Sequence, residues 1–408
     1  MKILFLNHNV QEFGTYFRAM AISDFFSRKG HSIDFVAVSN DKKLKTVKQV
    51  NGNTTSYFTP SLPLLMGKDE GWGLLEILVR LSVVLFKKYD IIYSFDHKPN
   101  VIIPALLLKK RNKAFLIADW CDWWGKDGLL SRNAELRKSM ISGKPYRLLR
   151  HYLQSILENF EEKWEESIPL KHADMVTTIC SELMERALKA GIREENLYLL
   201  PSGANIKKVN CEDKYICRKK LGFNVNKTLL GFLGNYHPDI PFLINAADNV
   251  LKKDKDIHLI LITPHSQFLY NQIRKSQYKN RITVTGKIRF DDLSPYLGIC
   301  DILLLPQEDN TGNRGRLPNK FCDYIAAGRP IVATDVGDVG KYINEYGLGY
   351  ATKPNEEDFS SKINDLLQNR DEWIVIGERA RIIAETVLNW EKLSEDFYNR
   401  LLDLKIIK

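Results

Sequence analysis

The sequence predicts an α/β protein of two domains, each built around a parallel β-sheet with helices on both faces. Short apolar runs alternate with stretches of helical spacing in both halves of the chain, which is the pattern of βαβ units. The 408 residues are more than one domain usually contains. Hydrophobic residues make up 44% and charged residues 27%, which excludes a disordered or low-complexity chain.

The first domain begins with a predicted strand at residues 3–6 and a loop at 7–14. A helix follows over residues 15–29 and ends before Gly30, because glycine is common just after a helix end. The alternating pattern at residues 31–38 predicts the next strand. Further strands of this domain are expected at residues 91–95, 115–118 and 175–179.

The second domain follows a Pro-Ser-Gly-Ala-Asn turn at residues 201–205 and a polar stretch that reaches residue 228. We therefore predict one Rossmann-like domain over residues 1–205, a second over 206–384, and a C-terminal helix over 385–408 that closes back toward the first domain. The strands of the second domain are expected at residues 229–233, 257–262, 282–284, 302–305 and 331–334. Two such domains would face a central cleft, and open α/β sheets bind ligands beyond the carboxyl ends of their strands.

The chain shows no membrane-spanning pattern. Its most apolar segment, residues 74–86, contains Glu76 and Arg80 and is shorter than the ~20 residues that a bilayer requires. It is predicted to be a core helix or a helix that rests on a membrane surface. The apolar run at residues 3–6 is too short for a signal peptide. The six cysteines form no CxxC pair, which favours a reducing compartment, so a cytoplasmic protein is expected.

Charge is unevenly distributed along the chain. Residues 1–150 contain 24 Lys and Arg against 13 Asp and Glu, whereas residues 151–205 contain 5 against 10. A basic surface of this kind suits nucleic acid, an anionic membrane or a phosphorylated substrate. No nucleic-acid-binding module accompanies the charge, so no nucleic acid partner is expected.

The most informative segment is RGRLPNKFCDYIAAGRPIVATD at residues 314–335. It predicts a polar loop, a helix from about Asn319 and another strand. The N-terminus of such a helix favours an anion, and Arg314, Arg316 and Lys320 add positive charge where a diphosphate would lie. The alternative is an ordinary βαβ unit whose basic residues are solvated.

This segment resembles the donor-binding region of the retaining glycosyltransferases of family 4 (glycosyl transferases group 1), which have the GT-B architecture. The resemblance implies that Asp323 binds the donor ribose, as the second of two acidic residues eight positions apart. The first would fall at Gly315, so that half of the motif is missing, and Glu308 and Asp309 lie upstream as substitutes. The resemblance also implies a nucleoside-diphosphate-sugar donor with no catalytic metal and no other cofactor.

Other parts of the chain resemble the same family. Gly14 and Thr15 match its first glycine loop, and Arg18 lies on the following helix, where the resemblance implies donor and acceptor contacts. Further donor-binding residues implied by the resemblance are Gly234, Lys287, Ile288 and Leu317. The basic residues that the family has after the glycine turn are replaced by Asn235, Tyr236 and His237. Arg316 and Lys320 are the candidates for the compensating charge.

The candidate catalytic residues follow two strands of the first domain. Asp119 and Asp122 lie beside Trp123 and Trp124, and carboxylates next to indole rings suit a sugar, because rings cover its C–H faces and carboxylates accept from its hydroxyls. The resemblance implies that Asp119 contacts the transferred sugar, with Asp122 as second choice and the two tryptophans on the acceptor. His97 is a candidate general base. The alternative is that the tryptophans are core aromatics and the aspartates cap the next segment.

The sequence thus predicts a cytoplasmic hexosyltransferase of the GT-B type, held at the inner face of the membrane by its basic domain. Its acceptor would be a polysaccharide, a glycan or a lipid-linked sugar of the cell envelope. Two alternatives remain open: an epimerase or hydrolase of nucleotide sugars with the same fold, and a degenerate nucleotide-binding protein without catalysis.

Overall fold

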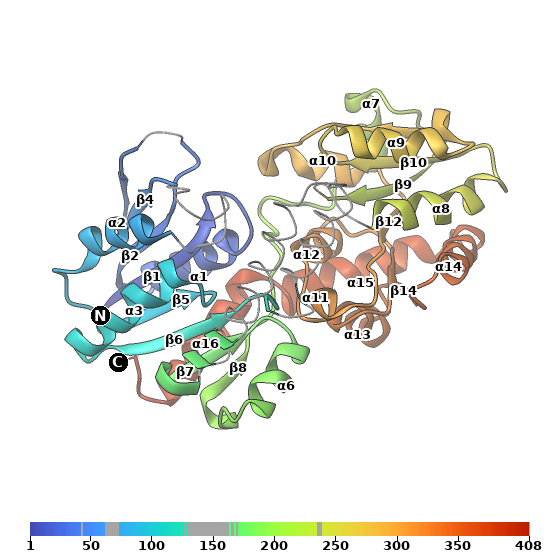
Figure 1. Ribbon diagram of the computed structural model, residues 1–408. Coiled ribbons are helices and arrows are strands. Elements are labelled where there is room, and N and C mark those ends of the chain that lie inside the picture. Colours follow the sequence, from blue (N-terminus) through green and yellow to red (C-terminus); the bar gives the residue numbers. More distant parts are fainter. Residues whose placement is uncertain are drawn as a thin grey trace, which may run out of the picture. The chain divides into compact units, whose positions relative to one another are not determined.

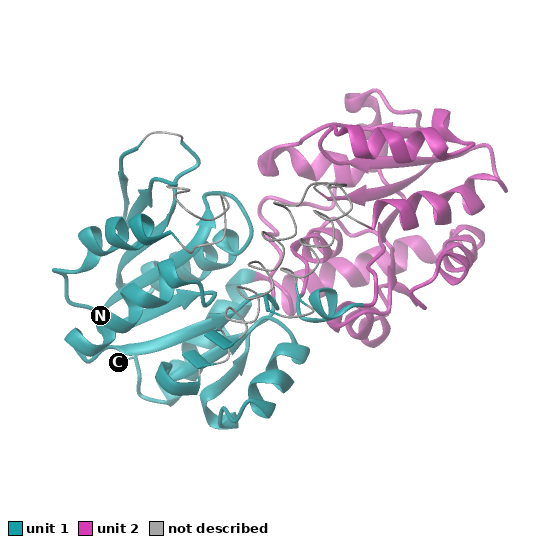
Figure 2. Cartoon of the chain, viewed as in Figure 1, with its two compact units in different colours: residues 1–201, 310–316, 390–408 teal, residues 202–309, 317–389 magenta. Residues whose placement is uncertain are grey.

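The computed structural model describes residues 1–41, 44–61, 73–125, 128, 163–164, 167–168, 170–234 and 239–407. The chain forms two compact units. Unit 1 comprises residues 1–201, 310–316 and 390–408, and unit 2 comprises residues 202–309 and 317–389 (Figure 2). The main chain therefore passes between the units at residues 201/202, 309/310, 316/317 and 389/390. The boundaries expected from the sequence were 205/206 and 384/385.

Unit 1 contains an eight-stranded sheet in the order β3-β4-β2-β1-β5-β6-β7-β8. Its strands are β1 Lys2–Val10, β2 Ser32–Val38, β3 Val47–Asn51, β4 Thr54–Thr59, β5 Ile91–Phe95, β6 Phe115–Trp120, β7 Met175–Thr178 and β8 Leu197–Leu199. Its helices are α1 Tyr16–Arg28, α2 Leu74–Val84, α3 Pro99–Asn112, α6 Ser181–Lys189, α11 Thr311–Arg314 and α16 Trp390–Asp403 (Figure 1). All neighbouring strands are parallel except β3 and β4, which form an antiparallel hairpin at the edge.

Both faces of this sheet are covered, which explains why its strands are continuous apolar runs. Successive side chains of β1 point to opposite faces. Ile3 and Phe5 pack in the cluster that contains the apolar residues of α1 and α16, whereas Leu4 and Leu6 pack with those of α2 and α3. The sheet is thus a central layer between two layers of helices.

Unit 2 contains a six-stranded parallel sheet in the order β11-β10-β9-β12-β13-β14. Its strands are β9 Thr228–Leu233, β10 Ile257–Ile262, β11 Ile282–Val284, β12 Ile302–Leu305, β13 Ile331–Thr334 and β14 Gly349–Thr352. Its helices are α7 Lys214–Leu221, α8 Ile240–Leu251, α9 Gln267–Lys275, α10 Leu293–Gly298, α12 Asn319–Ala326, α13 Asp338–Tyr346, α14 Glu356–Gln368 and α15 Glu372–Thr386. The two parallel-sheet units confirm the predicted fold class.

Three features differ from the sequence-based expectation. The hairpin of β3 and β4 was not predicted, because β3 is an exposed edge strand without an apolar face. The helix expected over residues 385–408 is interrupted between α15 and α16, where Ala204 N donates to Leu388 O and holds the break in place. Helix α2 is only half-buried, since Leu74 and Leu78 are exposed. No helix in the described part of the chain is long and apolar enough to cross a membrane.

Candidate functional site

Each sheet has one point at which the strand order reverses. In unit 2 the chain builds β9, β10 and β11 toward one edge and then returns to place β12 on the other side of β9. In unit 1 it builds β1, β2 and β4 and then returns to place β5 on the other side of β1. Ligands of open α/β sheets bind beyond the carboxyl ends of the strands at such a reversal. The loops after β9 and β12, and those after β1 and β5, are therefore the candidate sites.

Helix α12 is fixed at the reversal point of unit 2 by one side chain. The hydroxyl of Tyr324 accepts a hydrogen bond from Leu233 N, at the end of β9, at 2.7 Å. The same hydroxyl donates to Leu304 O, near the end of β12, at 3.1 Å. Tyr324 thus joins both strands to the helix. The cap residue Pro318 makes no side-chain hydrogen bond to the helix, and a helix N-terminus favours an anion.

The structure brings Gly234, Lys320 and Phe232 together beside this helix. A Cβ at Gly234 would lie 3.6 Å from Lys320 Nζ and 3.0 Å from the Phe232 ring, so a side chain here would crowd the approach to the lysine. The Lys320 ammonium lies 4.6 Å from the centre of the same ring. One turn further along α12, burial raises the pKa of Asp323 from 3.8 to about 7. A buried carboxyl of this kind can accept from a ligand hydroxyl.

The remaining donor-site candidates of unit 2 have different surroundings. Lys287 is exposed and Ile288 is half-buried in the loop after β11. That loop turns at Gly286, which has a φ of +85°, and a Cβ there would lie 2.9 Å from His265 Nε2, so both the backbone and the space require glycine. The Leu317 side chain is buried, and its carbonyl accepts from Ser202. Leu317 therefore belongs to the core of unit 2.

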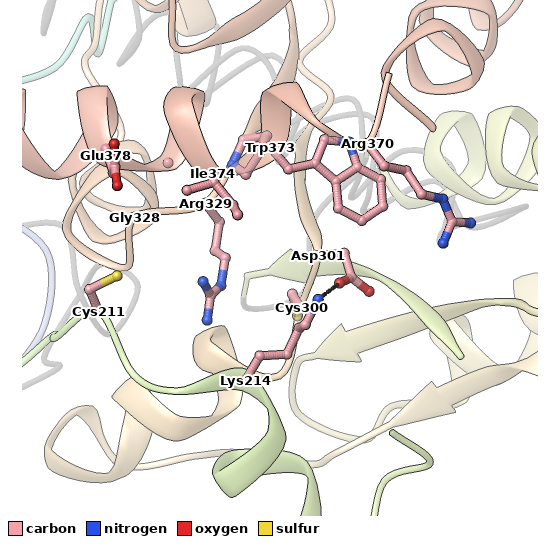
Figure 3. A pocket seen from close by; sticks show the side chains of 12 residues that line it. Cys211, Lys214, Cys300, Asp301, Gly328, Arg329, Arg370, Trp373, Ile374 and Glu378 are labelled. Carbon is pink, nitrogen blue, oxygen red and sulfur yellow. Dashed lines mark hydrogen bonds and ion pairs between the residues drawn. The ribbon is translucent and has the colours of Figure 1, made fainter. Parts of the chain in front are cut away.

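A cavity of about 450 Å³ lies at the opposite ends of the unit 2 strands, where β12 and β13 begin (Figure 3). It is lined by Asp301 and Pro330, the residues that precede those strands, and by Trp373 of α15. Lys214 pairs with Asp301 at 2.7 Å within it. Because this cavity is at the amino ends of the strands, it is separate from the candidate site.

In unit 1 the loop after β1 is held by a network of short polar side chains. Asn9 Oδ1 accepts from the Thr15 amide at 2.8 Å and from its hydroxyl at 2.5 Å, and Asn7 donates to the same hydroxyl at 2.7 Å. Gly14 has a φ of +53°, and a Cβ there would lie 2.8 Å from Asn9 Oδ1. Thr15 therefore uses its hydroxyl to shape the loop, and Gly14 lets the loop close.

Asp119 and Arg18 form a buried ion pair. Arg18 Nε and NH2 donate to the two Asp119 oxygens at 2.7 and 2.9 Å, and NH1 donates to Pro201 O. Thr177 and Cys121 donate to the same carboxylate, and Asp119 has no exposed surface. All these partners are internal, so we assign both residues a structural role, in place of the sugar and acceptor contacts expected from the sequence.

Asp96 lies at the centre of the polar cluster that follows β5. Its oxygens accept from Trp124 Nε1 at 2.5 Å and from the His97 amide at 3.1 Å, and His8 Nδ1 lies 3.6 Å away. Its backbone has a φ of +66°, a left-handed conformation that is costly without glycine and that clusters at functional sites. Burial raises the pKa of Asp96 to about 6, against the opposing effect of Lys98. The Lys98 ammonium lies 4.0 Å from the Trp124 ring centre.

Asp122 is near this cluster and near Arg316. Burial and the charge of Asp96 raise the pKa of Asp122 to about 7, while Arg316 acts in the opposite direction. Arg316 packs within unit 1 and donates to Asn313 Oδ1 at 2.5 Å. The structure therefore places Arg316 beside the predicted catalytic carboxyl in unit 1, while Lys320 and Asp323 belong to unit 2.

The other aromatic candidates have these surroundings. The Arg186 guanidinium stacks 3.7 Å from the centre of the Trp123 ring, and the fully buried His97 ring packs 5.4 Å from that of Trp120. A Cβ at Gly315 would lie 2.7 Å from Trp123 Cβ, so no side chain fits at the position where the family has its first glutamate. Glu308 and Asp309 are both exposed.

Residues 235–237, where basic side chains were expected and not found, lie outside the described residues. From the sequence we singled out His97 but not its neighbours Asp96 and Lys98, and we did not identify His8 or Arg186. The place of His8 and Asp96 in the sequence could have identified them as site candidates. Each lies at the end of one of the two strands that flank the reversal point of unit 1.

Part of the chain matches a known protein family. Residues 227–369, which lie largely in unit 2, match the family model for glycosyl transferases group 1. The "putative teichuronic acid biosynthesis glycosyltransferase TuaH" of Bacillus subtilis strain 168 is 24% identical over 261 residues. That alignment covers 62% of this chain and 62% of the relative, which is less than two thirds of its length.

Several solved structures match nearly the whole chain. Sucrose-phosphate synthase from Thermosynechococcus elongatus superposes with a TM-score of 0.76 at 14% identity, over 99% of this chain and 98% of that one. Anabaena Alr3699/HepE, solved in complex with UDP and glucose, has a TM-score of 0.69 at 16% identity, over 99% and 100% of the two chains. At these identities the likenesses show the fold.

Proposed function

We propose that this chain, which has the GT-B fold of the glycosyltransferases, moves a sugar from a nucleoside-diphosphate donor bound by unit 2 to an acceptor bound by unit 1. The observation that carries the proposal is the N-terminus of α12, which Tyr324 fixes at the reversal point of the unit 2 sheet. It lies within the segment that matches the family model. The UDP held by HepE is a ligand of the proposed class.

Different residues of unit 2 bind different groups of the donor. The helix N-terminus and the Lys320 ammonium stabilise the negative charge that develops on the departing diphosphate, which is electrostatic stabilisation by preorganised groups. The Asp323 carboxyl accepts from the ribose hydroxyls. Because these charges come from the protein, we propose transfer without a catalytic metal, and the resemblance favours retention of configuration.

Asp122 is the proposed acceptor-side carboxyl in unit 1. Its pKa of about 7 allows it to hold or release a proton near neutral pH. Asp96 and Trp124 position this cluster, and the exposed part of the Trp123 and Trp124 rings suits a sugar face.

The first experiment is thermal unfolding of the protein with UDP, GDP, ADP, dTDP and CMP and their sugar conjugates, with and without magnesium. A ligand at 100 times its Kd stabilises the folded state by about 2.7 kcal/mol. Lys320→Met should weaken nucleoside diphosphate binding more than nucleoside binding, and Lys279→Met, at an exposed position of the same unit, serves as control. If the wild-type protein responds to none of the panel, the donor site is disproved.

A second candidate function is nucleotide binding without transfer. It is favoured by Gly315, where Trp123 leaves no room for the glutamate of the family motif. Nucleotide binding without turnover on any acceptor would support it. An epimerase or hydrolase would instead convert the nucleotide sugar with no acceptor present.

For the acceptor side we propose a lipid-linked or envelope glycan at the inner face of the cell membrane. Leu74 and Leu78 are four residues apart on α2 and both are exposed, and Phe86, in the turn that follows α2, is 83% exposed. The Arg111 guanidinium lies 5.7 Å from the Phe86 ring centre. Apolar side chains next to basic ones suit an anionic lipid surface.

Sedimentation with phosphatidylglycerol vesicles at low salt tests this surface. Phe86→Ser should lower binding, because it removes the most exposed ring, while Ile374→Ser in unit 2 makes a similar change at a 71% exposed position and should leave binding unchanged. Equal binding by both variants would remove this surface from the membrane proposal.

A further inference from the structure

Among the residues that the structure describes, a buried glutamine at the reversal point of unit 2 has no hydrogen-bond partner for its side chain. Gln307 follows β12 by two residues and is 2% exposed. Neither its Nε2 nor its Oε1 has a hydrogen-bond partner in the described structure. The next two residues, Glu308 and Asp309, are exposed, so the chain turns the neutral amide inward and the charges outward.

The backbone of Gln307 is fixed. Its amide N–H donates to Thr334 Oγ1 at 2.8 Å, and the same hydroxyl donates back to Gln307 O at 2.8 Å. Thr334 is the last residue of β13 and is fully buried. Two reciprocal bonds between the ends of β12 and β13 hold the residue in place, so its position does not depend on a ligand.

Leaving such an amide unpaired is costly. A buried polar group without a partner destabilises a fold, and the large majority of buried side-chain polar atoms in proteins are paired. An apolar side chain of similar size would fill the same space without this cost. A function that needs the amide explains why glutamine is present.

From this position and this unmet hydrogen-bonding capacity we propose that Gln307 recognises the sugar that is transferred. The inference rests on the proposed function of unit 2. A carboxamide donates two hydrogen bonds through its NH2 and accepts through its oxygen, which matches neighbouring sugar hydroxyls, each of which donates and accepts. A neutral amide adds no charge for the diphosphate, which has Lys320 and the α12 N-terminus. Asp323 serves the ribose, and of the donor groups that remain we assign the hydroxyls of the transferred hexose to Gln307.

The test compares Gln307→Met with the wild-type protein. For UDP, GDP, ADP and dTDP, the Kd of each nucleotide is divided by the Kd of its conjugates with glucose, galactose and N-acetylglucosamine, measured by titration calorimetry. This ratio is the gain in affinity contributed by the sugar. Gln307→Met should lower the ratio about 10-fold for the preferred conjugate, which is the loss of one or two hydrogen bonds, and should leave the Kd of the bare nucleotide unchanged.

The melting temperature of the ligand-free protein is a second readout, and Gln307→Met should raise it while lowering the affinity ratio. Because methionine removes an unpaired buried amide and keeps the volume, Gln307→Met should raise the melting temperature of the ligand-free protein. Gln307→Glu, which replaces the NH2 donors and buries a charge, should lower it. Gln368→Met, at the exposed end of α14, is the matched control and should change neither the ratio nor the melting temperature by a comparable amount.

The outcomes separate the inference from the function on which it rests. If wild-type protein binds no nucleotide, the proposed function fails. If it binds a nucleotide but no sugar adds affinity, or if Gln307→Met keeps the wild-type ratio, the role of Gln307 is overturned while the donor site stands. A fall in ligand-free stability in Gln307→Met would show that the amide serves the fold, and would also overturn it.

Discussion

Three aspartates, Asp119, Asp122 and Asp323, differ in the charged groups that surround their carboxyls. All three were expected at the site. Asp119 is fully paired with a buried arginine, whereas burial without a close cation raises the pKa of Asp323 and burial beside Asp96 raises that of Asp122. A raised pKa at the ligand end of a sheet makes Asp122 and Asp323 candidates for a functional role, whereas the paired Asp119 is a candidate for a structural one.

The Arg18–Asp119 pair gives the first prediction. Asp119→Ala should destabilise unit 1 by about 3–5 kcal/mol, because it leaves the buried Arg18 guanidinium without its anion. Combining it with Arg18→Met should recover much of that loss, since the unpaired charge is removed as well. Urea unfolding followed by circular dichroism measures both. A stable Asp119→Ala protein that has lost only turnover would restore Asp119 to the catalytic site.

Asp323 gives a prediction about pH. Because its pKa is raised from 3.8 to about 7 in the folded protein, its contribution to stability is present below about pH 4 and is lost as the pH rises through about 7. Asp323→Asn, which cannot ionise, should therefore be more stable than wild type at pH 8, on the order of 2–4 kcal/mol. The difference should shrink as the pH falls from 8 toward 4, because below about pH 4 the carboxyl is neutral in both the folded and the unfolded protein. Melting curves from pH 5 to 8 measure the difference, and parallel curves would contradict the raised pKa.

Asp122 gives a prediction about activity. If its carboxylate accepts a proton from the acceptor, kcat/KM should rise with pH through about 7, the pKa to which burial and Asp96 raise it. Asp122→Asn should lower kcat by about 100-fold or more, which is the usual contribution of a general base. It should also abolish the rise of kcat/KM with pH. An unchanged profile in the variant would assign the pH dependence to another group.

At the scale of elements, the position of α12 depends on the hydrogen bonds of one side chain, Tyr324. Tyr324→Phe should cost about 1–3 kcal/mol, because it deprives Leu233 N and Leu304 O of their shared partner. It should also weaken nucleotide binding, since the N-terminus of α12 is no longer tied to β9 and β12. Thermal unfolding with and without UDP measures both effects. Tyr215→Phe, at an exposed position on α7, is the control and should change neither.

The strands that were predicted with the correct bounds share one feature of burial. Those predicted at residues 91–95, 257–262, 282–284, 302–305 and 331–334 have the same bounds in the structure. Each is a short apolar run, and four of the five are buried along their whole length or all but one residue. The edge strands β3 and β14 were not predicted, because neither is a continuous buried apolar run, and β4 and β8 were not predicted either.

At the scale of the whole molecule, the two units have separate hydrophobic cores. We expect two transitions in calorimetric unfolding, of which UDP raises only that of unit 2, because a ligand stabilises the unit that binds it. Lys320→Met should abolish the shift. A single transition that moves as a whole with UDP would show that the units unfold together.

The sequence alone determined the fold class, the positions of most strands and the start of the helix at Asn319, and it predicted an anion site at that helix start. These follow from local signals: apolar periodicity, a glycine or proline at an element end, and charge near a helix N-terminus. The resemblance of residues 314–335 to a glycosyltransferase motif added the donor class. All of this information lies within a few neighbouring residues.

Only the tertiary structure decided which polar residues are available to a ligand. Arg18 and Asp119 are 101 residues apart, and nothing local indicates that they neutralise each other. The partners of Asp96 come from strands and loops far apart in the chain, and Gln307 is an ordinary loop residue until its burial is known. The physical reason is that hydrogen bonding and burial of a side chain depend on contacts between distant segments, whereas secondary structure depends largely on near neighbours.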